Sequence, residues 1–396
     1  MKKNKRILFL LGAGAAYHWF DKSKGISAKT DDITRKMVND ICFCKVLYKH
    51  LKQKLPVVNF ETLVNAIENL ALHYYGLRIP VDYDHSIIFE PSDWIENYFK
   101  TRDNESISIR LVDIYKRCIE IIIKMIKSYD LNIKVNKSKN ESLKNFICFA
   151  KSQDYILRAY TLNYDQMFID VCKDTPIEFI DGFEKTEFLV DPYIIGSSDY
   201  IYEFSPNQVI NEINKNCFYN LHGSIFWHWK HSPLSNSAKS QFLKTSQYFG
   251  GCFDWQSINI DTLKESNINE RIINAPIITG FKKLQRMNIE PFNAISNTFY
   301  RDCHSADVVV FIGYSFGDSH INSVLSSANI TDKEILIVDY NLQKDKKNYK
   351  LESIIGSDFN DIIDNGVNKK GNIRYFSEGI TDFLELEQYK TVESFF

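Results

Sequence analysis

Short apolar runs that stop at Gly, Asn, Asp, His or Ser recur along this chain, and they constrain its fold more than any other feature. Several are followed by helical spacing, as in Phe292–Cys303 and Ile321–Leu325. Continuous apolar strands that alternate with helices indicate a parallel sheet with helices on both faces. The sequence therefore predicts an α/β fold, a Rossmann-like doubly wound parallel sheet, whose ligand binds beyond the carboxyl ends of the strands. The expected strands are Ile7–Leu11, Tyr155–Thr161, Cys217–Leu221, Ala275–Thr279, Asp307–Ile312, Glu334–Val338 and Asn372–Phe376.

Residues 31–151 differ in character, because their apolar residues recur at spacings of three and four, which is typical of amphipathic helices. A chain of 396 residues has room for two to three domains, or for one large domain with an insertion. We therefore expect residues 1–30 and 152–396 to form the sheet domain and residues 31–151 to form a helical insertion domain. Within the insertion, the polar stretch Lys134–Glu141 predicts an exposed loop.

Composition excludes several classes of protein. The 48 Lys and Arg balance the 50 Asp and Glu, so no basic surface points to direct binding of nucleic acid. The eight cysteines are scattered, with no C-x-x-C pair, which argues against a zinc ribbon and favours free thiols in a reducing cytoplasm. No apolar run reaches the ~18–20 residues of a membrane span. The basic and apolar N-terminus resembles a secretory signal, but a buried strand that enters a glycine turn explains it better, and we expect a soluble, cytoplasmic protein.

Two glycine turns are candidate sites for an anion. Gly12, Ala13 and Gly14 follow the first strand, and small residues there allow backbone N–H groups to approach a pyrophosphate. The motif is incomplete, because Tyr17 follows where a third small residue is expected, and a plain packing turn explains it about as well. The second turn, Gly313–Asp318, is also able to hold an anion or a ribose.

Polar residues at two other strand ends are candidates for catalysis. Asn163 and Asp165 follow one strand, where an amide and a carboxylate can meet a ligand, although an Asx turn that caps the strand is the favoured explanation when they are taken alone. His222 precedes Gly223 at the end of another strand, and a lone histidine is more often structural than catalytic. Each signal is weak when it is taken alone.

The order of these segments is more specific than any one of them. They are GAGAA, TLNYD, LHGS, IGYSFGDSHIN and VDYN, and in this order they resemble the sirtuin family, in particular its divergent bacterial branch of NAD-consuming defence proteins. The resemblance covers about residues 5–30 and 155–345.

The resemblance implies a role for each matching residue. Gly12, Ala13 and Gly14 would cradle the NAD pyrophosphate, Asn163 and Asp165 would hold the nicotinamide ribose and the attacking water, and His222 would be the general base. The residues expected on the adenosine side are Gly313, Ser315, Asn341 and, as the acidic partner of the ribose, Asp339. Asp318 matches the aspartate of the branch's turn motif.

Two departures from the family concern deacylation. Deacylating sirtuins carry a four-cysteine zinc module after the His-Gly pair, whereas this chain has only Cys252 there, so we expect no zinc. The loop over the nicotinamide pocket is also altered, because Gly25-Ile26-Ser27-Ala28 keeps only the Gly-Ile of the family's segment. Both departures disfavour removal of acyl groups from lysine.

The function implied by the resemblance is hydrolysis of NAD to ADP-ribose and nicotinamide, with NAD as the substrate. In this branch the reaction depletes NAD during phage infection, as abortive antiviral defence. Such activity needs gating, and the resemblance implies a homo-oligomer with a HerA-like hexameric ATPase as partner. The alternatives are an NAD or ADP-ribose sensing module without turnover, and an ADP-ribosyltransferase or deacylase.

Overall fold

In the part of the chain that the structure describes, six parallel strands form the central sheet. The computed structural model describes residues 5–21, 23, 27–74, 93–185, 201–229, 242–245, 255–259, 269–273, 276–279, 287–340, 349–356 and 359–396. The order across the sheet is β12-β11-β10-β1-β2-β5, and every neighbouring pair is parallel. This confirms the doubly wound α/β fold that the sequence predicts. The strands are β1 (Arg6–Leu11), β2 (Ile156–Thr161), β5 (Cys217–Asn220), β10 (Val308–Ile312), β11 (Glu334–Val338) and β12 (Ile373–Phe376).

The sheet is buried on both faces, because alternate residues of each strand enter two different hydrophobic cores. In β1, Ile7, Phe9 and Leu11 belong to one core, whereas Leu8 and Leu10 belong to the other. These five side chains are at most 2% exposed. Burial on both faces explains why the strands are continuous apolar runs in the sequence rather than alternating ones.

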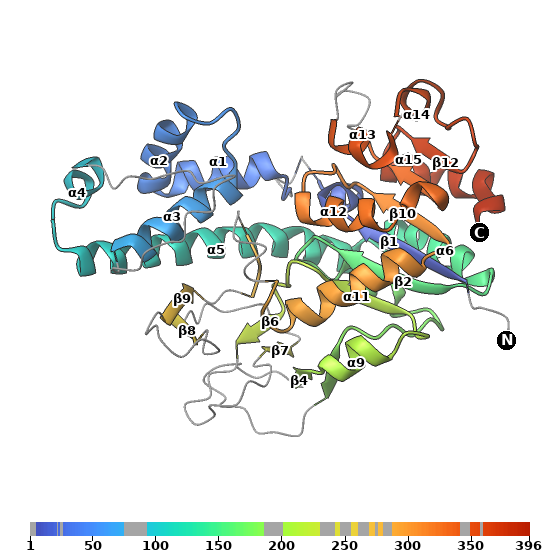
Figure 1. The fold of residues 1–396 in the computed structure, drawn as a ribbon, viewed down its shortest axis with the longest axis horizontal. Coiled ribbons are helices and arrows are strands. Elements are labelled where there is room, and N and C mark those ends of the chain that lie inside the picture. The colour runs from blue at the N-terminus through green and yellow to red at the C-terminus, as the bar shows by residue number, and fades with distance from the viewer. Residues whose placement is uncertain are drawn as a thin grey trace.

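Helices cover both faces of the sheet (Figure 1). The face of Phe9 is covered by α6 (Lys137–Ser152), α7 (Met167–Cys172), α15 (Ile380–Glu385) and the 3₁₀ helix η5 (Gln388–Phe395). The face of Leu8 is covered by α9 (Pro206–Asn211), α11 (Phe292–Ser305), α12 (Ser319–Ser327), α13 (Tyr349–Ile355) and α14 (Phe359–Asn365), with the short 3₁₀ helix η3 (Ile330–Asp332) after α12.

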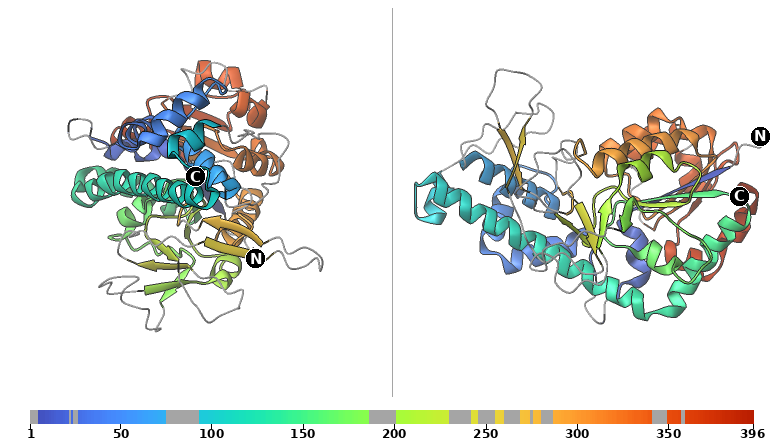
Figure 2. Two further views of the ribbon diagram at one scale, coloured as in Figure 1. Left: turned by 90° about the vertical axis from the view of Figure 1, so that its left-hand side faces the viewer. Right: turned by 90° about the horizontal axis from the view of Figure 1, so that it is seen from below.

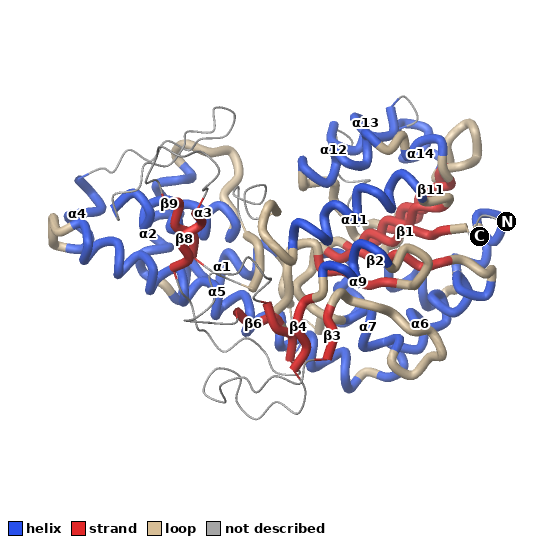
Figure 3. Tube along the Cα trace, turned by 60° about the horizontal axis from the view of Figure 1, so that its bottom comes forward, coloured by secondary structure: helices blue, strands red, loops and turns tan. Residues whose placement is uncertain are grey.

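A helical part extends from one end of the sheet (Figures 1 and 3). Its longest element, α5, runs from the sheet to the far end of the molecule, as the view from below in Figure 2 shows. One hydrophobic core joins the two parts, since Phe9 of β1 and Leu63 of α3 belong to the same cluster. The helices are α1 (Thr30–Asp40), α2 (Cys42–Lys52), α3 (Phe60–Tyr74), α4 (Asp93–Phe99) and α5 (Asn104–Val135).

The prediction of an exposed loop over Lys134–Glu141 is wrong, because α6 begins only two residues after α5 ends. Polar side chains of this stretch form hydrogen bonds with the 3₁₀ helix η1 (Ala13–Trp19) and so are not exposed to solvent alone. The Asn140 side chain accepts a hydrogen bond from Trp19 Nε1 at 2.8 Å and donates one to the carbonyl of Ile133 at 2.8 Å. Lys139 Nζ donates to the carbonyl of His18 at 2.5 Å.

The strand expected over Ala275–Thr279 is not part of the parallel sheet. The described residues 276–279 make one antiparallel bridge, between Ile277 and Gly223, beside the turn that follows β5. Among the described residues between β2 and α11, two smaller antiparallel sheets are formed. They consist of β3 (Phe183–Lys185), β4 (Ile201–Phe204), β7 (Phe242–Thr245) and β6 (Trp227–Trp229) in one, and β8 (Trp255–Asn259) with β9 (Asn269–Ile273) in the other.

Candidate functional site

A cavity of about 330 Å³ opens at the point where the strand order reverses. From β1 the chain proceeds to β2 and β5 on one side, and β10 to β12 lie on the other side. Ligands of doubly wound sheets bind at this switch point, and pockets of 300–1,000 Å³ are typical of small-molecule sites. Residues of the strand ends and of the helical part line it together, among them Gly12, Ala13, Thr30, Asn59, Glu61, Tyr129, Asn163, His222, Ser315 and Asp318.

The two glycine turns pack directly against each other at this point. Gly12 N donates to the carbonyl of Ile312 at 2.9 Å, and Gly14 N donates to the carbonyl of Gly313 at 3.0 Å. Gly313 has a φ of +59°, and a Cβ added there would lie 2.3 Å from the backbone nitrogen of Ala15. The glycines are therefore required by the contact between the turns, which is the packing explanation left open by the sequence. Ala13 is the exposed residue of the first turn and faces the cavity.

Asn163 is held in one orientation at the end of β2. Its side-chain Nδ2 donates to the carbonyl of Gly12 at 3.0 Å, and its backbone nitrogen donates to Thr161 Oγ1 at 3.0 Å. From the neighbouring strand, Asn220 Nδ2 donates to the carbonyls of Asn163 and Asp165 at 3.1 and 2.9 Å. The amide lines the cavity and is 9% exposed.

Asp165 forms an Asx turn, which is the structural alternative to ligand binding that the sequence leaves open. Its Oδ1 accepts from the backbone N–H of Met167 at 2.9 Å, at the start of α7, and its Oδ2 accepts from the hydroxyl of Tyr129 at 2.5 Å. The side chain is 1% exposed, and burial raises the pKa of this carboxyl to about 6. Asp165 is not among the described residues that line the cavity, so it meets α5 rather than the space beside Asn163.

His222 is fixed by the segment that crosses the end of β5. Its carbonyl accepts from Ile278 N at 2.7 Å, and a Cβ added to the following Gly223 would lie 2.1 Å from the carbonyl oxygen of Pro276. The imidazole lines the cavity, although His222 is only 2% exposed. Its Nε2 lies 3.4 Å from the Nε2 of His320, in the first turn of α12.

The turn after β10 is stabilised from within α12. The hydroxyl of Tyr314 donates to Asn322 Oδ1 at 2.7 Å, and Asn322 Nδ2 donates to the carbonyl of Phe316 at 2.8 Å. Phe316 is completely buried with a φ of +57°, so the turn has little freedom. As a result Ser315 and Asp318 lie on the wall of the cavity.

Two of the residues expected to bind NAD follow β11 in the sequence. Asp339 is 7% exposed and is not one of the described residues that line the cavity. It lies near Tyr17. Burial and the charge of Asp339 both raise the pKa of the Tyr17 hydroxyl. Asn341 lies outside the described residues, as do Cys252 and the Gly25-Ile26 pair of the altered loop.

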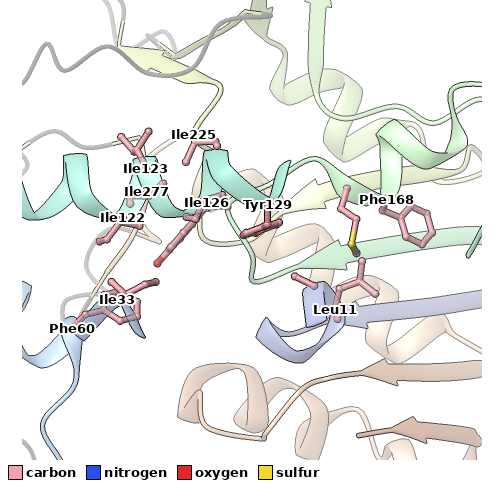
Figure 4. Close-up of a cluster of buried hydrophobic side chains, with 14 of the residues drawn as sticks. Leu11, Ile33, Phe60, Ile122, Ile123, Ile126, Tyr129, Phe168, Ile225 and Ile277 are labelled. Atoms are coloured by element: carbon pink, nitrogen blue, oxygen red, sulfur yellow. The ribbon is translucent and has the colours of Figure 1, made fainter. Parts of the chain in front are cut away.

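The helical part supplies one side of the cavity, and no motif in the sequence indicates this. Thr30 begins α1, Asn59 and Glu61 lie at the start of α3, and Tyr129 lies on α5. Figure 4 shows Ile126 and Tyr129 on α5 between Ile33 and Phe60 on one side and Leu11 at the end of β1 on the other. His320 was also missed, although it lies inside the IGYSFGDSHIN segment, because only the fold brings it to His222.

The electrostatic character of the wall is acidic. Glu61 and Asp318 line the cavity, whereas no Lys or Arg does so in the part of the chain that the structure describes. Within the same part, no cluster of His, Cys, Asp and Glu could hold a metal ion. No helix there is long and apolar enough to cross a membrane.

Comparison with known proteins identifies the domain. The family model of the SIR2-like domain matches residues 158–354, from β2 to α13. No curated protein matches the chain. The matched region contains Asn163, His222 and the Gly313 turn, and the chain is therefore a member of the sirtuin-like family.

Proposed function

For this sirtuin-like protein we propose the activity of an NAD⁺ glycohydrolase, which splits NAD⁺ into ADP-ribose and nicotinamide. A SIR2-like domain fits an NAD-utilising activity. The observation that supports hydrolysis most strongly is that Asn163 and His222 line one cavity at the switch point of the sheet. Binding alone would need no general base there.

The chemistry requires few groups, and the cavity offers them. Nicotinamide is already a cationic leaving group, so no general acid is needed, and the transition state resembles the oxocarbenium ion of glycoside hydrolysis. Because Nδ2 of Asn163 is committed to Gly12, its Oδ1 is the atom that would accept from a ribose hydroxyl or the attacking water. His222 would take the proton of that water as general base.

The proposed placement of the phosphates differs from a simple glycine cradle. The N–H groups of Gly12 and Gly14 already donate to protein carbonyls. The exposed Ala13 at the start of η1 and the Ser315 hydroxyl are the wall groups that would meet the pyrophosphate. The acidic Glu61 and Asp318 would repel a 2′-phosphate, so we propose NAD rather than NADP as the substrate.

We also propose that the activity is gated through the helical part. Thr30, Glu61 and Tyr129 form one side of the cavity, so a partner or a second copy bound to these helices would alter the site. Antiphage defence by NAD depletion, homo-oligomerisation and a HerA-like ATPase partner are the biological setting that the sequence resemblance implies.

The decisive experiment measures nicotinamide release from NAD⁺ by the purified chain and by Asn163→Ala and His222→Ala. We expect release by the wild type and a loss on the order of 10²-fold or more in each variant. Asn297→Ala and His304→Ala are matched controls, since both residues are exposed on α11.

Calorimetric titration with NAD⁺ separates the alternatives. Binding without release would indicate a sensing module or an enzyme that needs its partner. Absence of both binding and release would contradict the proposed function, and transfer of ADP-ribose to protein would replace hydrolysis by an ADP-ribosyltransferase.

A further inference from the structure

The proposed hydrolysis releases a proton, and this proton must leave the buried site before the next turnover. The bond between the nicotinamide nitrogen and ribose C1′ breaks with its electron pair staying on nitrogen, and the water oxygen bonds to C1′. The products are ADP-ribose, neutral nicotinamide and one proton, which His222 receives. Since His222 is only 2% exposed, a base that keeps this proton is inactive in the next turnover.

His320 is placed to take that proton. Its Nε2 lies 3.4 Å from the Nε2 of His222, and the two ring centroids are 5.5 Å apart with 39° between the planes. Two imidazole nitrogens at this distance form a hydrogen bond only when one carries a proton and the other does not. The protonation states of the two rings are therefore linked by their geometry.

The position of His320 differs from that of His222 in a useful way. His222 lines the cavity, whereas His320 is not among the described residues that line it. His320 lies in the first turn of α12 and is only partly buried. A proton passed through the pair would leave on the side of α12, by a route that the substrate does not occupy.

From this geometry we propose that His320 relays the proton released by hydrolysis from His222 to solvent. His222 accepts the proton of water on one ring nitrogen and gives up the proton on Nε2 to Nε2 of His320. His320 then releases a proton from its other ring nitrogen, so both rings end neutral but each as its other tautomer. The starting tautomers return through proton exchange with water after the products leave the cavity. This inference rests on the proposed hydrolysis, and in it His320 is a positioning and relay residue, while His222 alone meets the substrate.

Pre-steady-state measurement of nicotinamide release tests the relay. The buffer is dilute and its molecules are bulky, so that the buffer itself does not carry protons from the site. For His320→Ala and His320→Gln we expect a first turnover at the wild-type rate, followed by steady-state turnover slower by on the order of tenfold or more. Glutamine keeps a hydrogen-bonding group but cannot take up a proton at neutral pH. Added imidazole, a small proton carrier, should restore the steady-state rate, and kcat/KM should stay unchanged because it does not include the step after the first turnover. His304→Ala on α11 is the matched control.

Each other outcome overturns a different claim. A slow first turnover that imidazole does not restore would show a structural role for His320, and unchanged steady-state turnover in dilute buffer would show no role. Absence of both release and NAD⁺ binding in the wild type would instead overturn the hydrolase proposal, and this inference with it.

A second measurement tests the contact without any turnover. The ¹⁵N resonances of the His222 ring report which of its nitrogens carries a proton. They should shift in His320→Gln and stay in place in His304→Ala. Unchanged His222 resonances in His320→Gln would overturn the inference.

Discussion

At the scale of single residues, Asp165 shows how one carboxyl can have a mainly structural task beside a candidate active site. Its two oxygens are used by Met167 N and by the hydroxyl of Tyr129 on α5. Burial raises its pKa to about 6 from the ordinary value of 3.8. At a pH between these two pKa values, the folded chain holds a proton that the unfolded chain has released. Asp165 therefore stabilises the folded chain at low pH, and this contribution is lost as the pH rises through about 6.

Asp165→Asn should remove this pH dependence while keeping an acceptor for Met167. We expect the variant to gain about 1–2 kcal/mol of unfolding free energy relative to the wild type between pH 5 and pH 8. Urea unfolding of both proteins at the two pH values measures this difference. Asp174→Asn, at an exposed position after α7, is the control and should show no such change. A difference that is constant between pH 5 and pH 8 would contradict the raised pKa.

At the scale of elements, a close contact between backbone segments joins the turns after β1 and β10. Gly313→Ala would place a Cβ 2.3 Å from both Ala15 N and the carbonyl carbon of Gly14, at a φ of +59°. Gly371→Ala is a matched control, because Gly371 has a φ of +77° but nothing within 4 Å of the added Cβ. The control isolates the cost of the backbone conformation, which is about 1–2 kcal/mol.

We expect Gly313→Ala to cost clearly more than this, because backbone atoms cannot move aside as a flexible side chain can. Thermal unfolding compares the two variants, and NAD⁺ titration shows whether the turns still form the cavity wall. Equal losses of stability in Gly313→Ala and Gly371→Ala would mean that the turns separate easily. In that case the glycines would serve the ligand rather than the packing.

The sheet was predictable from the sequence because its strands are buried on both faces and read as apolar runs. Where the prediction failed, tertiary contacts decided the structure. Ile277 is as apolar as a strand residue, yet it pairs with the turn at Gly223 instead of a neighbouring strand. Lys139 and Asn140 are polar like a loop but bind η1 as part of α6. The pairs Tyr129–Asp165 and His222–His320 join positions 36 and 98 residues apart, which no local pattern reveals.

At the scale of the whole molecule, the helical part and the sheet share one hydrophobic core. The sequence predicts residues 31–151 as a separate insertion domain, and that division remains a prediction. Yet α5 is one continuous helix that carries Leu111 in the helical part and Tyr129 at the cavity, with both side chains in the same buried cluster. A helix that is shared in this way couples the folding of the two parts, since neither can bury its face of α5 alone.

Calorimetry should therefore show a single unfolding transition that responds to a cavity made far from the sheet. Leu63→Ala on α3, at a side chain with no exposure, should cost about 2–5 kcal/mol and lower the temperature of that one transition by several degrees. Leu386→Ala, at a side chain that is 69% exposed, should leave it within about a degree. If instead Leu63→Ala splits off an earlier transition and the remainder melts at the wild-type temperature, residues 31–151 fold on their own. The wall that they give to the cavity would then be able to open without unfolding the sheet, and gating would need only the detachment of this part.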